Sequence, residues 1–314
     1  MTGSTSSPVS RSIGGVRVGT VGLGAMPLSV EGRPEEEQAV ATIHAALDAG
    51  VTLIDTADSY HWHADEVGHN ERLIARALAA YGPGARDVLV ATKGGRGRPG
   101  DGSWTVDGDP RHLRRAARAS AARLGVEAIG LYQLHKPDPA VPFAESVGAL
   151  RELADEGIIR MVGLSNVDVA QIRTAREILG PLLVSVQNRF SPAHRATRDT
   201  LDLCTRLGLA FLPWSPLGGI SRSAVDDPGT DAPPADTPFH AVARAHGVSP
   251  QQVCLAWHLA QSPVVLPIPG ARRPASVRDS AAAAGLALPA DALRALEGPE
   301  TLEGLEEPAE PRLP

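Results

Sequence analysis

Short apolar runs alternate with longer amphipathic segments along almost the whole chain. Residues 51–60 (VTLIDTADSY) begin with an apolar, β-branched run, and residues 69–82 (HNERLIARALAAYG) follow with apolar positions at helical spacing. A run without polar alternation is typical of a strand that is buried on both faces, as in a parallel sheet. Apolar positions at helical spacing before a glycine predict a helix that ends at that glycine.

This pair of patterns recurs along the chain. The predicted strands lie within residues 16–26, 51–60, 87–95, 128–137, 159–167, 183–192, 209–219 and 264–272. The predicted helices lie within residues 34–50, 69–82, 109–125, 142–157, 169–180, 197–208, 249–262 and 274–285, with an additional helix at 238–247. Such strand–helix units favour an α/β fold, a (β/α)8 TIM barrel with a short N-terminal β-hairpin or extended lead-in.

A doubly wound fold with a glycine fingerprint is the alternative. Residues 19–27 (GTVGLGAMP) contain a G-x-G after the first predicted strand. The third glycine of the fingerprint is missing, and the segment runs into Pro27 rather than into a helix. The partial match is therefore weak evidence, and the barrel is the favoured fold.

The same pattern divides the chain into three regions. Residues 1–12 (MTGSTSSPVSRS) lack an apolar core, so we expect a disordered lead-in rather than a secretory signal. Residues 13–298 form the predicted barrel domain, and residues 299–314 form an acidic, proline-rich tail. Within the barrel, the polar, proline-rich segment 226–238 after the seventh strand is predicted to be a mobile loop.

Composition narrows the class of protein. The net charge of −6 comes from interspersed acidic and basic residues, without the basic stripe that nucleic-acid binding needs. No apolar run reaches the roughly 18 residues of a membrane span. Cys204 and Cys254 lie in apolar, helical-looking segments, which argues against a disulfide framework and favours a cytoplasmic setting. None of these patterns indicates an oligomeric state.

Polar residues stand where the predicted strands end. In a barrel of this type the loops after the strands carry the functional site, so polar side chains at these ends converge on one mouth. The residues at these positions are Asp55, Tyr60, Lys93, His135, Ser165, Asn166, Gln187, Asn188, Trp214 and Ser215. Each alone has a structural explanation, such as a solvated charge or a local hydrogen bond. Their recurrence at equivalent positions indicates a shared site.

With these motifs in place, the chain resembles the aldo-keto reductase family. The resemblance rests on DTADSY, the lysine after strand three, the histidine after strand four, GLSN, VQN, PWSPLGG and PIPGARR, in that order, from about Gly14 to about Gly298. It implies a barrel that binds a nicotinamide dinucleotide without a Rossmann fold and transfers hydride reversibly to a carbonyl. Within the family, the chain is similar in places to bacterial NADP-dependent pyridoxal reductases.

The resemblance implies a catalytic tetrad of Asp55, Tyr60, Lys93 and His135. Tyr60 would donate the proton that the carbonyl oxygen needs, although a free tyrosine titrates near pH 10. The ammonium of Lys93 is expected to lower the pKa of Tyr60, and Asp55 to pair with Lys93. His135 would donate a second hydrogen bond to the substrate oxygen.

The resemblance also implies the residues that bind the cofactor. At the nicotinamide end it implies Ser165, Asn166, Gln187 and Trp214, with Asp55 and the first-strand contact of Gly24, Ala25 and Met26. At the pyrophosphate it implies Ser215, Leu217 and Gly218, and at the far end of the cofactor Gly270, Arg272, Ser276, Asp279 and Ser280. Two of them depart from the family pattern, since Gly270 stands in place of a lysine and Ser276 in place of an arginine. We expect NADPH rather than NADH, because Arg272 and Arg273 offer forked donors to a phosphate.

Residues 61–70 (HWHADEVGHN) admit two interpretations. His61, His63, Asp65, Glu66 and His69 would suit a metal, but their spacing lacks the H-E-x-x-H of a zincin helix, and we expect no metal. The favoured interpretation is that His61, Trp62 and His63 line the substrate mouth, with Asn70 capping the second helix. Trp104 and His135 are the other expected substrate contacts, although Trp104 would equally pack its own loop.

Three functions compete. The favoured one is an NADPH-dependent carbonyl reductase with a small-molecule substrate and Tyr60 as proton donor. The first alternative is an NADPH-binding sensor module on the same barrel with little turnover, because fold does not dictate function. The second is a metal-dependent hydrolase, for which only Asp55 and His135 qualify as ligands. A small aromatic aldehyde such as pyridoxal is one expected substrate, while a sugar, terpenoid or polyketide carbonyl suits an uncharged, tryptophan-lined mouth equally well.

Overall fold

A curled parallel sheet forms the centre of the molecule. The computed structural model describes residues 10–221 and 236–297, in which seven strands pair in the order β11–β10–β9–β8–β5–β4–β3. They are β3 (Leu23–Gly24), β4 (Leu53–Asp55), β5 (Leu89–Gly94), β8 (Ile129–Leu134), β9 (Ile159–Ser165), β10 (Leu183–Gln187) and β11 (Ala210–Phe211). All six pairings between these neighbours are parallel.

Residues 264–270 occupy the eighth strand position and close the barrel. Leu266 N donates to Phe211 O at 2.8 Å on one side, and Gly24 N donates to Pro269 O at 3.0 Å on the other. A single bridge also joins Gly24 to Gly270. At Gly24 the two chains lie so close that a β-carbon would stand 2.6 Å from Ile268 O, which only glycine avoids. The predicted (β/α)8 barrel is confirmed.

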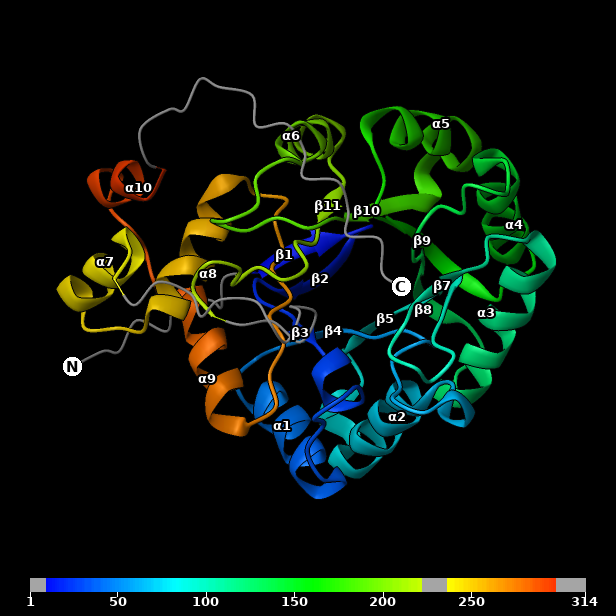
Figure 1. The fold of residues 1–314 in the computed structure, drawn as a ribbon, viewed down its shortest axis with the longest axis horizontal. Helices are drawn as coiled ribbons and strands as arrows, with labels where there is room; N and C mark the ends of the chain where they lie inside the picture. Colours follow the sequence, from blue (N-terminus) through cyan, green and yellow to red (C-terminus); the bar gives the residue numbers. More distant parts are fainter. Residues whose placement is uncertain (1–9, 222–235, 298–314) are drawn as a thin grey trace.

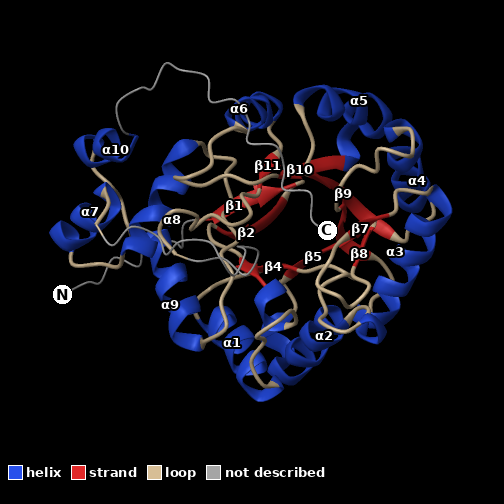
Figure 2. Ribbon diagram, in the orientation of Figure 1, coloured by secondary structure: helices blue, strands red, loops and turns tan. Residues whose placement is uncertain are grey.

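Helices surround the sheet, as Figures 1 and 2 show. They are α1 (Glu36–Asp48), α2 (His69–Tyr81), α3 (Pro110–Leu124), α4 (Phe143–Asp155), α5 (Val169–Leu179), α6 (Arg198–Leu207), α7 (Pro238–His246), α8 (Pro250–Gln261), α9 (Pro274–Ala282) and α10 (Ala290–Glu297). Short 3₁₀ turns are η1 (Met26–Leu28), η2 (Ala64–Glu66), η3 (Gly82–Ala85), η4 (Gly180–Leu182) and η5 (Ala283–Gly285). Within the described ranges no helix is long and apolar enough to cross a membrane.

Capping residues explain where the helices start and stop. The side chain of Asp109 accepts hydrogen bonds from the backbone of Arg111 and His112 at the start of α3. The same helix ends at Gly125, whose φ of 69° is the left-handed conformation that glycine adopts without steric cost. Glycine is likewise the C-cap of α2, α5, α6 and α7, whereas α1 and α4 have their C-caps at Ala49 and Glu156, one residue before the predicted glycine.

An N-terminal hairpin covers one end of the barrel. Strands β1 (Ser10–Ile13) and β2 (Val16–Gly19) pair antiparallel, so the hairpin expected as one alternative is present. The lead-in expected up to residue 12 therefore overlaps β1, while residues 1–9 lie outside the described ranges. Ile13 and Val18 pack into the barrel interior against residues such as Leu53 and Leu131. Burying one such side chain contributes about 1.5–3 kcal/mol, which holds the hairpin in place.

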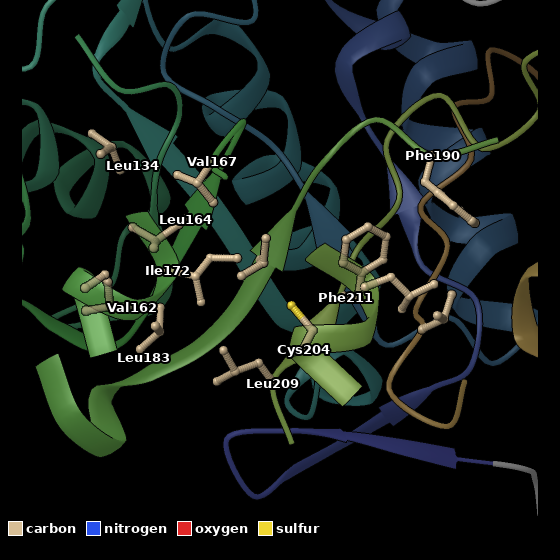
Figure 3. Close-up of a cluster of buried hydrophobic side chains, with 14 of the residues drawn as sticks. Leu134, Val162, Leu164, Val167, Ile172, Leu183, Phe190, Cys204, Leu209 and Phe211 are labelled. Carbon is tan, nitrogen blue, oxygen red and sulfur yellow. The ribbon is translucent and has the colours of Figure 1, made fainter. Parts of the chain in front are cut away.

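The largest apolar cluster lies between strands β8–β11 and the helices outside them. Figure 3 shows part of it, with side chains from β9, α5 and α6 meeting in one layer. A second cluster joins α1, α2 and α9 to β3 and β4. The two clusters hold the strands rigidly, so side chains at the strand ends have defined positions. Most of the predicted loop 226–238 and all of the tail 299–314 lie outside the described residues.

Candidate active site

Four polar side chains meet at the carboxyl ends of three neighbouring strands. Asp55 ends β4, Lys93 lies in β5, and His135 follows β8, while Tyr60 lies in the loop after β4. These strands are adjacent in the sheet. All four side chains are at least 94% buried. The residues of the expected tetrad are therefore brought together, although they are spread over 81 positions of the sequence, from 55 to 135.

The ammonium of Lys93 is held by three acceptors. Its Nζ donates to Asp55 Oδ2 at 2.6 Å, to Thr56 O at 2.9 Å and to the phenol oxygen of Tyr60 at 2.9 Å. An ammonium has three protons, so every donor is used and the group has one orientation. A buried charge of this kind is tolerated because its partner carboxylate and its hydrogen bonds replace water.

Two glutamines orient the carboxylate of Asp55 from the barrel interior. Asp55 Oδ1 accepts from Gln187 Nε2 at 2.8 Å and from Gln133 Nε2 at 3.2 Å. Both glutamines are buried and lie on strands, β10 and β8. The amide nitrogen of Gln187 is thus engaged inside the site, which leaves its carbonyl oxygen for the expected cofactor contact.

The pKa of Tyr60 shifts in the direction opposite to the sequence expectation. Burial raises the pKa of the phenol, and the nearby Lys93 ammonium opposes the shift without reversing it. For Lys93, burial lowers the pKa, but the negative charge of Asp55 outweighs that effect and the net shift is upward. Lys93 lowers the pKa of Tyr60 as expected, but burial outweighs it, so the expected net lowering is wrong. Both groups keep their protons at neutral pH, which is the state a proton donor needs.

His135 stands beside Tyr60 as a neutral imidazole. The two ring centroids are 5.7 Å apart at an interplanar angle of 83°. Burial holds the pKa of His135 well below its usual value, with smaller contributions from the charges of Lys93 and Arg96. Its Nδ1 lies 3.4 Å from Ser59 Oγ, and a neutral imidazole carries one N–H donor. The ring can therefore donate a single hydrogen bond to a substrate oxygen.

Asn70 fastens the loop that carries Tyr60. Its Oδ1 accepts from Thr56 Oγ1 at 2.6 Å, and its Nδ2 donates to Ala25 O at 2.9 Å and to Ser29 Oγ at 2.7 Å. The expectation that Asn70 caps α2 is wrong, since the N-cap is Gly68 with φ 75°. Asn70 lies in the first turn of α2, and its side chain contacts residues that follow β3 and β4 instead of capping the helix.

Trp104 lies over the site from the loop between β5 and α3. Its ring is edge-on to Tyr60 at 6.5 Å and to His135 at 6.3 Å. The guanidinium carbons of Arg96 and Arg98 each lie 4.6 Å from its centroid. Trp104 is thus placed where a substrate contact was expected. The expectation of an uncharged mouth is wrong, because two charged side chains lie against this tryptophan.

Trp62 lies further out than Trp104. It is 38% exposed and stacks on His63 at 5.2 Å. Its ring also borders a pocket of about 370 Å³ with Leu28, Arg33 and Leu73. His61, by contrast, is fully buried, so it does not line an open mouth as expected.

The side chains considered above as metal ligands contact different partners. His61 Nδ1 lies 2.7 Å from His63 O, and His69 Nδ1 lies 2.8 Å from Ser29 Oγ. Glu66 pairs with Arg33 at 2.8 Å. In the described part of the chain, no group of three histidine, cysteine, aspartate or glutamate side chains is arranged to hold a metal ion.

The residues expected at the nicotinamide end of the cofactor border the tetrad. Asn166 follows β9 with φ 59°, a conformation rare outside glycine. Its Nδ2 donates to His135 O at 2.9 Å and its Oδ1 accepts from Trp214 Nε1 at 3.2 Å. Ser165 supplies its hydroxyl oxygen to the same Asn166 amide. Ala25 N donates to Asp55 O, which places the expected contact of Gly24, Ala25 and Met26 next to the site.

Two side chains of α8 contact the turn that follows β11. Ser215 has φ 48° and Gly219 has φ 88°, so the backbone turns sharply around Leu217 and Gly218. Pro216 O accepts from Cys254 Sγ at 3.3 Å and lies 2.8 Å from His258 Nε2. Both side chains are fully buried and stand one helical turn apart. No sequence pattern pointed to this support, because a cysteine and a histidine on an apolar helix face are usually core residues.

The residues expected at the far end of the cofactor lie around α9. Arg272 donates to Pro27 O at 3.3 Å and to Glu31 O at 3.0 Å, beside Gly270. Ser276 lies in the first turn of α9, and Ser280 is buried on the same helix. The carboxylate of Asp279 accepts from Ser249 Oγ at 2.7 Å and from Gln252 Nε2 at 2.6 Å, so it ties α9 to α8.

The fold and this site together define a class: a parallel α/β barrel with an Asp–Tyr–Lys–His cluster at the carboxyl ends of its strands. Residues 20–299 match the model of the aldo/keto reductase family. The protein belongs to that family, which is one of oxidoreductases.

Relatives and a solved structure agree with this assignment. Pyridoxine 4-dehydrogenase of Escherichia coli is 32% identical over 297 residues, which cover 91% of this chain and 96% of that protein. The 6-dehydroglucose reductase of Novosphingobium aromaticivorans is 34% identical over 282 residues, 88% of this chain and 90% of that protein. An aldo-keto reductase from Klebsiella pneumoniae in complex with NADPH has a TM-score of 0.75 at 26% identity, covering 93% of this chain and 95% of that one.

Proposed function

We propose that this protein is an NADPH-dependent reductase that converts a small aldehyde or ketone to an alcohol, with Tyr60 as the proton donor. One observation carries the proposal: the buried ammonium of Lys93 donates at 2.9 Å to the phenol oxygen of Tyr60. As an acceptor in that bond, the oxygen keeps its own proton for another partner. The family and the reductases among the relatives support the reaction class.

Each side chain of the site has its own role in carbonyl reduction. A bound nicotinamide supplies the hydride, and the protein supplies the proton. Tyr60 donates its proton to the carbonyl oxygen as negative charge develops there, while Lys93 stabilises the phenolate that remains. The neutral His135 donates a hydrogen bond to the same oxygen and orients the substrate. Proton donation of this kind contributes about 10²–10⁴-fold to the rate.

The donor set around α9 fits a phosphate. Arg272 and Arg273 precede the helix and are exposed, and Ser276 lies in its first turn. A helix N-terminus with neighbouring arginines attracts anions through its backbone N–H groups and its dipole. These residues would hold the adenosine phosphates of the cofactor, and the forked donor of Arg272 favours NADPH over NADH. The NADPH complex of the Klebsiella pneumoniae relative supports this choice.

For the substrate, the relatives support broad chemical classes rather than one compound. Pyridoxine 4-dehydrogenase among the relatives supports an aromatic aldehyde such as pyridoxal, and 6-dehydroglucose reductase supports a sugar-derived carbonyl. The two buried free thiols, Cys204 and Cys254, are compatible with an enzyme of the reducing cytoplasm.

The proposal is tested by following NADPH oxidation with pyridoxal, benzaldehyde, a keto-sugar and a simple ketone. The expected result is turnover of at least one carbonyl, with the alcohol identified as product and a weaker response with NADH. Binding of NADPH without turnover of any carbonyl would instead favour the sensor module. Arg272→Ala should raise the dissociation constant for NADPH more than that for NADH.

A further inference from the structure

A small hairpin carries the ring of Trp104. Strands β6 (Arg96–Gly97) and β7 (Thr105–Val106) pair antiparallel after β5, at the end of the barrel where the reacting groups lie. Arg98 directly follows β6 and Trp104 directly precedes β7, and the guanidinium carbon of Arg98 lies 4.6 Å from the ring centroid. A pairing this short is weak by itself, so the position of Trp104 depends on contacts made outside the hairpin.

Arg98 is a buried cation whose countercharge is Glu31. Only 4% of the Arg98 side chain is exposed, and both of its Nη atoms donate to the carboxylate of Glu31, Nη1 at 2.8 Å. Nη1 also donates to His61 O at 2.9 Å. A buried guanidinium that loses its carboxylate is strongly destabilising, because the remaining charge has neither water nor a charged partner. Without Glu31, Arg98 would have to move toward solvent, and the tryptophan against it would lose its support.

The loop that carries Glu31 is fixed at other points. Glu31 lies between η1 and α1, and its carbonyl oxygen accepts from Arg272 Nη2 at 3.0 Å. On the same loop, Arg33 forms another two-pronged ion pair, with Glu66 at 2.8 Å and 2.9 Å. The loop thus carries two ion pairs of similar geometry. The pair of Glu31 ends at the tryptophan hairpin, whereas the pair of Arg33 joins the loop to η2.

Trp104 lies beside the reacting groups. Its ring centroid is 6.5 Å from that of Tyr60 and 6.3 Å from that of His135, and the residue is only partly buried. A substrate whose carbonyl oxygen contacts both Tyr60 and His135 therefore lies next to this ring. Aromatic rings attract each other in edge-on or offset arrangements, so an aromatic substrate benefits from the tryptophan only when that ring is held in place.

We propose that Glu31 is a positioning residue for carbonyl reduction, because its ion pair with Arg98 holds Trp104 as a fixed wall for an aromatic substrate. This inference rests on the proposed reductase function and deepens it, since it names aromatic aldehydes as the class that the wall favours. Glu31 acts through Arg98 and the ring, so its effect on the reaction requires Trp104 to be present.

Glu31→Gln tests the inference, because it keeps the size of the side chain and the carbonyl contact with Arg272 but removes the negative charge. With NADPH and benzaldehyde or pyridoxal, kcat/KM should fall about ten-fold, through KM more than through kcat. The dissociation constant for NADPH should stay within about two-fold of wild type. Glu66→Gln, the matched control, removes the charge from the other ion pair of the loop and should lower kcat/KM by less than about two-fold.

A double-mutant cycle with Trp104→Ala separates positioning from general destabilisation. In the Trp104→Ala background, Glu31→Gln should change kcat/KM for the aromatic aldehyde by less than about two-fold, because the wall that Glu31 positions is absent. Glu31→Asp keeps the charge on a shorter side chain and should retain more activity than Glu31→Gln. If Glu31→Gln does not fold, Glu31→Asp takes its place in the same cycle.

The outcomes distinguish this inference from the function on which it rests. Unchanged kcat/KM in Glu31→Gln, an equal loss with and without Trp104, or an equal loss in Glu66→Gln would each overturn the positioning role. A wild type that reduces a keto-sugar but neither aromatic aldehyde would also overturn it, and the reductase function would stand. Failure to reduce any of these carbonyls, with NADPH bound, would contradict the reductase function itself.

Discussion

Lys93 donates a hydrogen bond to the phenol oxygen of Tyr60 at 2.9 Å, across the ends of two neighbouring strands. The direction of this bond matters, because it makes the phenol oxygen an acceptor and leaves the phenol proton for a substrate. The other two protons of the ammonium are bound by Asp55 and by Thr56 O. The proton donor of the proposed reaction is thus fixed by a cation that has no freedom to rotate.

Removing only one partner of the Lys93–Asp55 ion pair is predicted to destabilise the folded protein. In Lys93→Met the carboxylate of Asp55 stays buried without its countercharge, so the free energy of unfolding should fall by about 3–5 kcal/mol. The double variant Asp55→Asn with Lys93→Met should recover part of that loss, because no lone charge remains. Chemical denaturation measures both. A double variant less stable than the single one would contradict the role given to the pair.

Asn70 is predicted to position the Tyr60 loop rather than to cap α2. Asn70→Ala leaves the hydroxyl of Thr56 without its partner and removes one of the two donors to Ala25 O, which keeps Leu28 N, so the change should cost about 1–3 kcal/mol of unfolding free energy and lower kcat. The milder control is Thr56→Val, which removes only one of these hydrogen bonds. The free energy of unfolding and kcat are measured on both variants. If Asn70→Ala matched the wild type in both quantities, the positioning role would be wrong.

Asp58 is predicted to make the fold less stable as pH rises. Burial raises the pKa of this carboxyl to about 8, with Glu71 adding to the shift and Arg123 and Lys93 opposing it. Its Oδ1 has no hydrogen-bond partner among the described residues. Between the ordinary aspartate pKa, near 4, and 8, the folded state binds a proton that the unfolded state has lost. Stability should therefore fall by up to about 1.4 kcal/mol per pH unit across this window.

Asp58→Asn is the test of that prediction, since the amide resembles the protonated carboxyl but does not titrate. Unfolding free energies are compared at pH 5 and pH 8. The difference between variant and wild type should be small at pH 5 and should favour the variant at pH 8. The same difference at both pH values would show that Asp58 is ionised in the folded protein.

The rate of carbonyl reduction is predicted to be insensitive to pH around 6.5. The pKa of His135 is held well below this value and that of Tyr60 is raised above its usual 10, so neither group titrates between about pH 6 and 9. Activity should decline only at alkaline pH, where Tyr60 loses its proton. The profile of kcat/KM is compared with that of His135→Gln, which has no imidazole. An inflection near pH 6.5 that disappears in this variant would contradict the neutral His135.

The sequence indicated the barrel and the residues at its strand ends for the same physical reason. Strands buried on both faces lack polar alternation, so Asp55, Lys93 and His135 stood out at their carboxyl ends. Parallel neighbours bring those ends together, as the structure shows. The catalytic and cofactor roles of these residues stay predictions that the experiments above address.

Other parts of the site depend on contacts that no local pattern records. Gln133 reaches Asp55 only because β8 packs at a particular register, and His258 reaches Pro216 O from a helix 42 positions further along the chain. The strands β6 and β7 have two residues each, too short for any periodicity, so the arginine beside Trp104 was not foreseen. The direction of the Tyr60 pKa shift was missed because burial, which the sequence does not show, outweighs the charge of Lys93.

The central claim is that the phenol of Tyr60 supplies the proton. Tyr60→Phe keeps the ring beside Trp104 and His135 and removes only the hydroxyl, so the measurement is a single turnover with NADPH already bound, using any aldehyde that the wild type reduces. The predicted result is a dissociation constant for NADPH within about two-fold of wild type and a reduction rate that is about 10²–10⁴-fold slower. A variant that reduces the aldehyde within a few-fold of the wild-type rate would show that the proton comes from elsewhere.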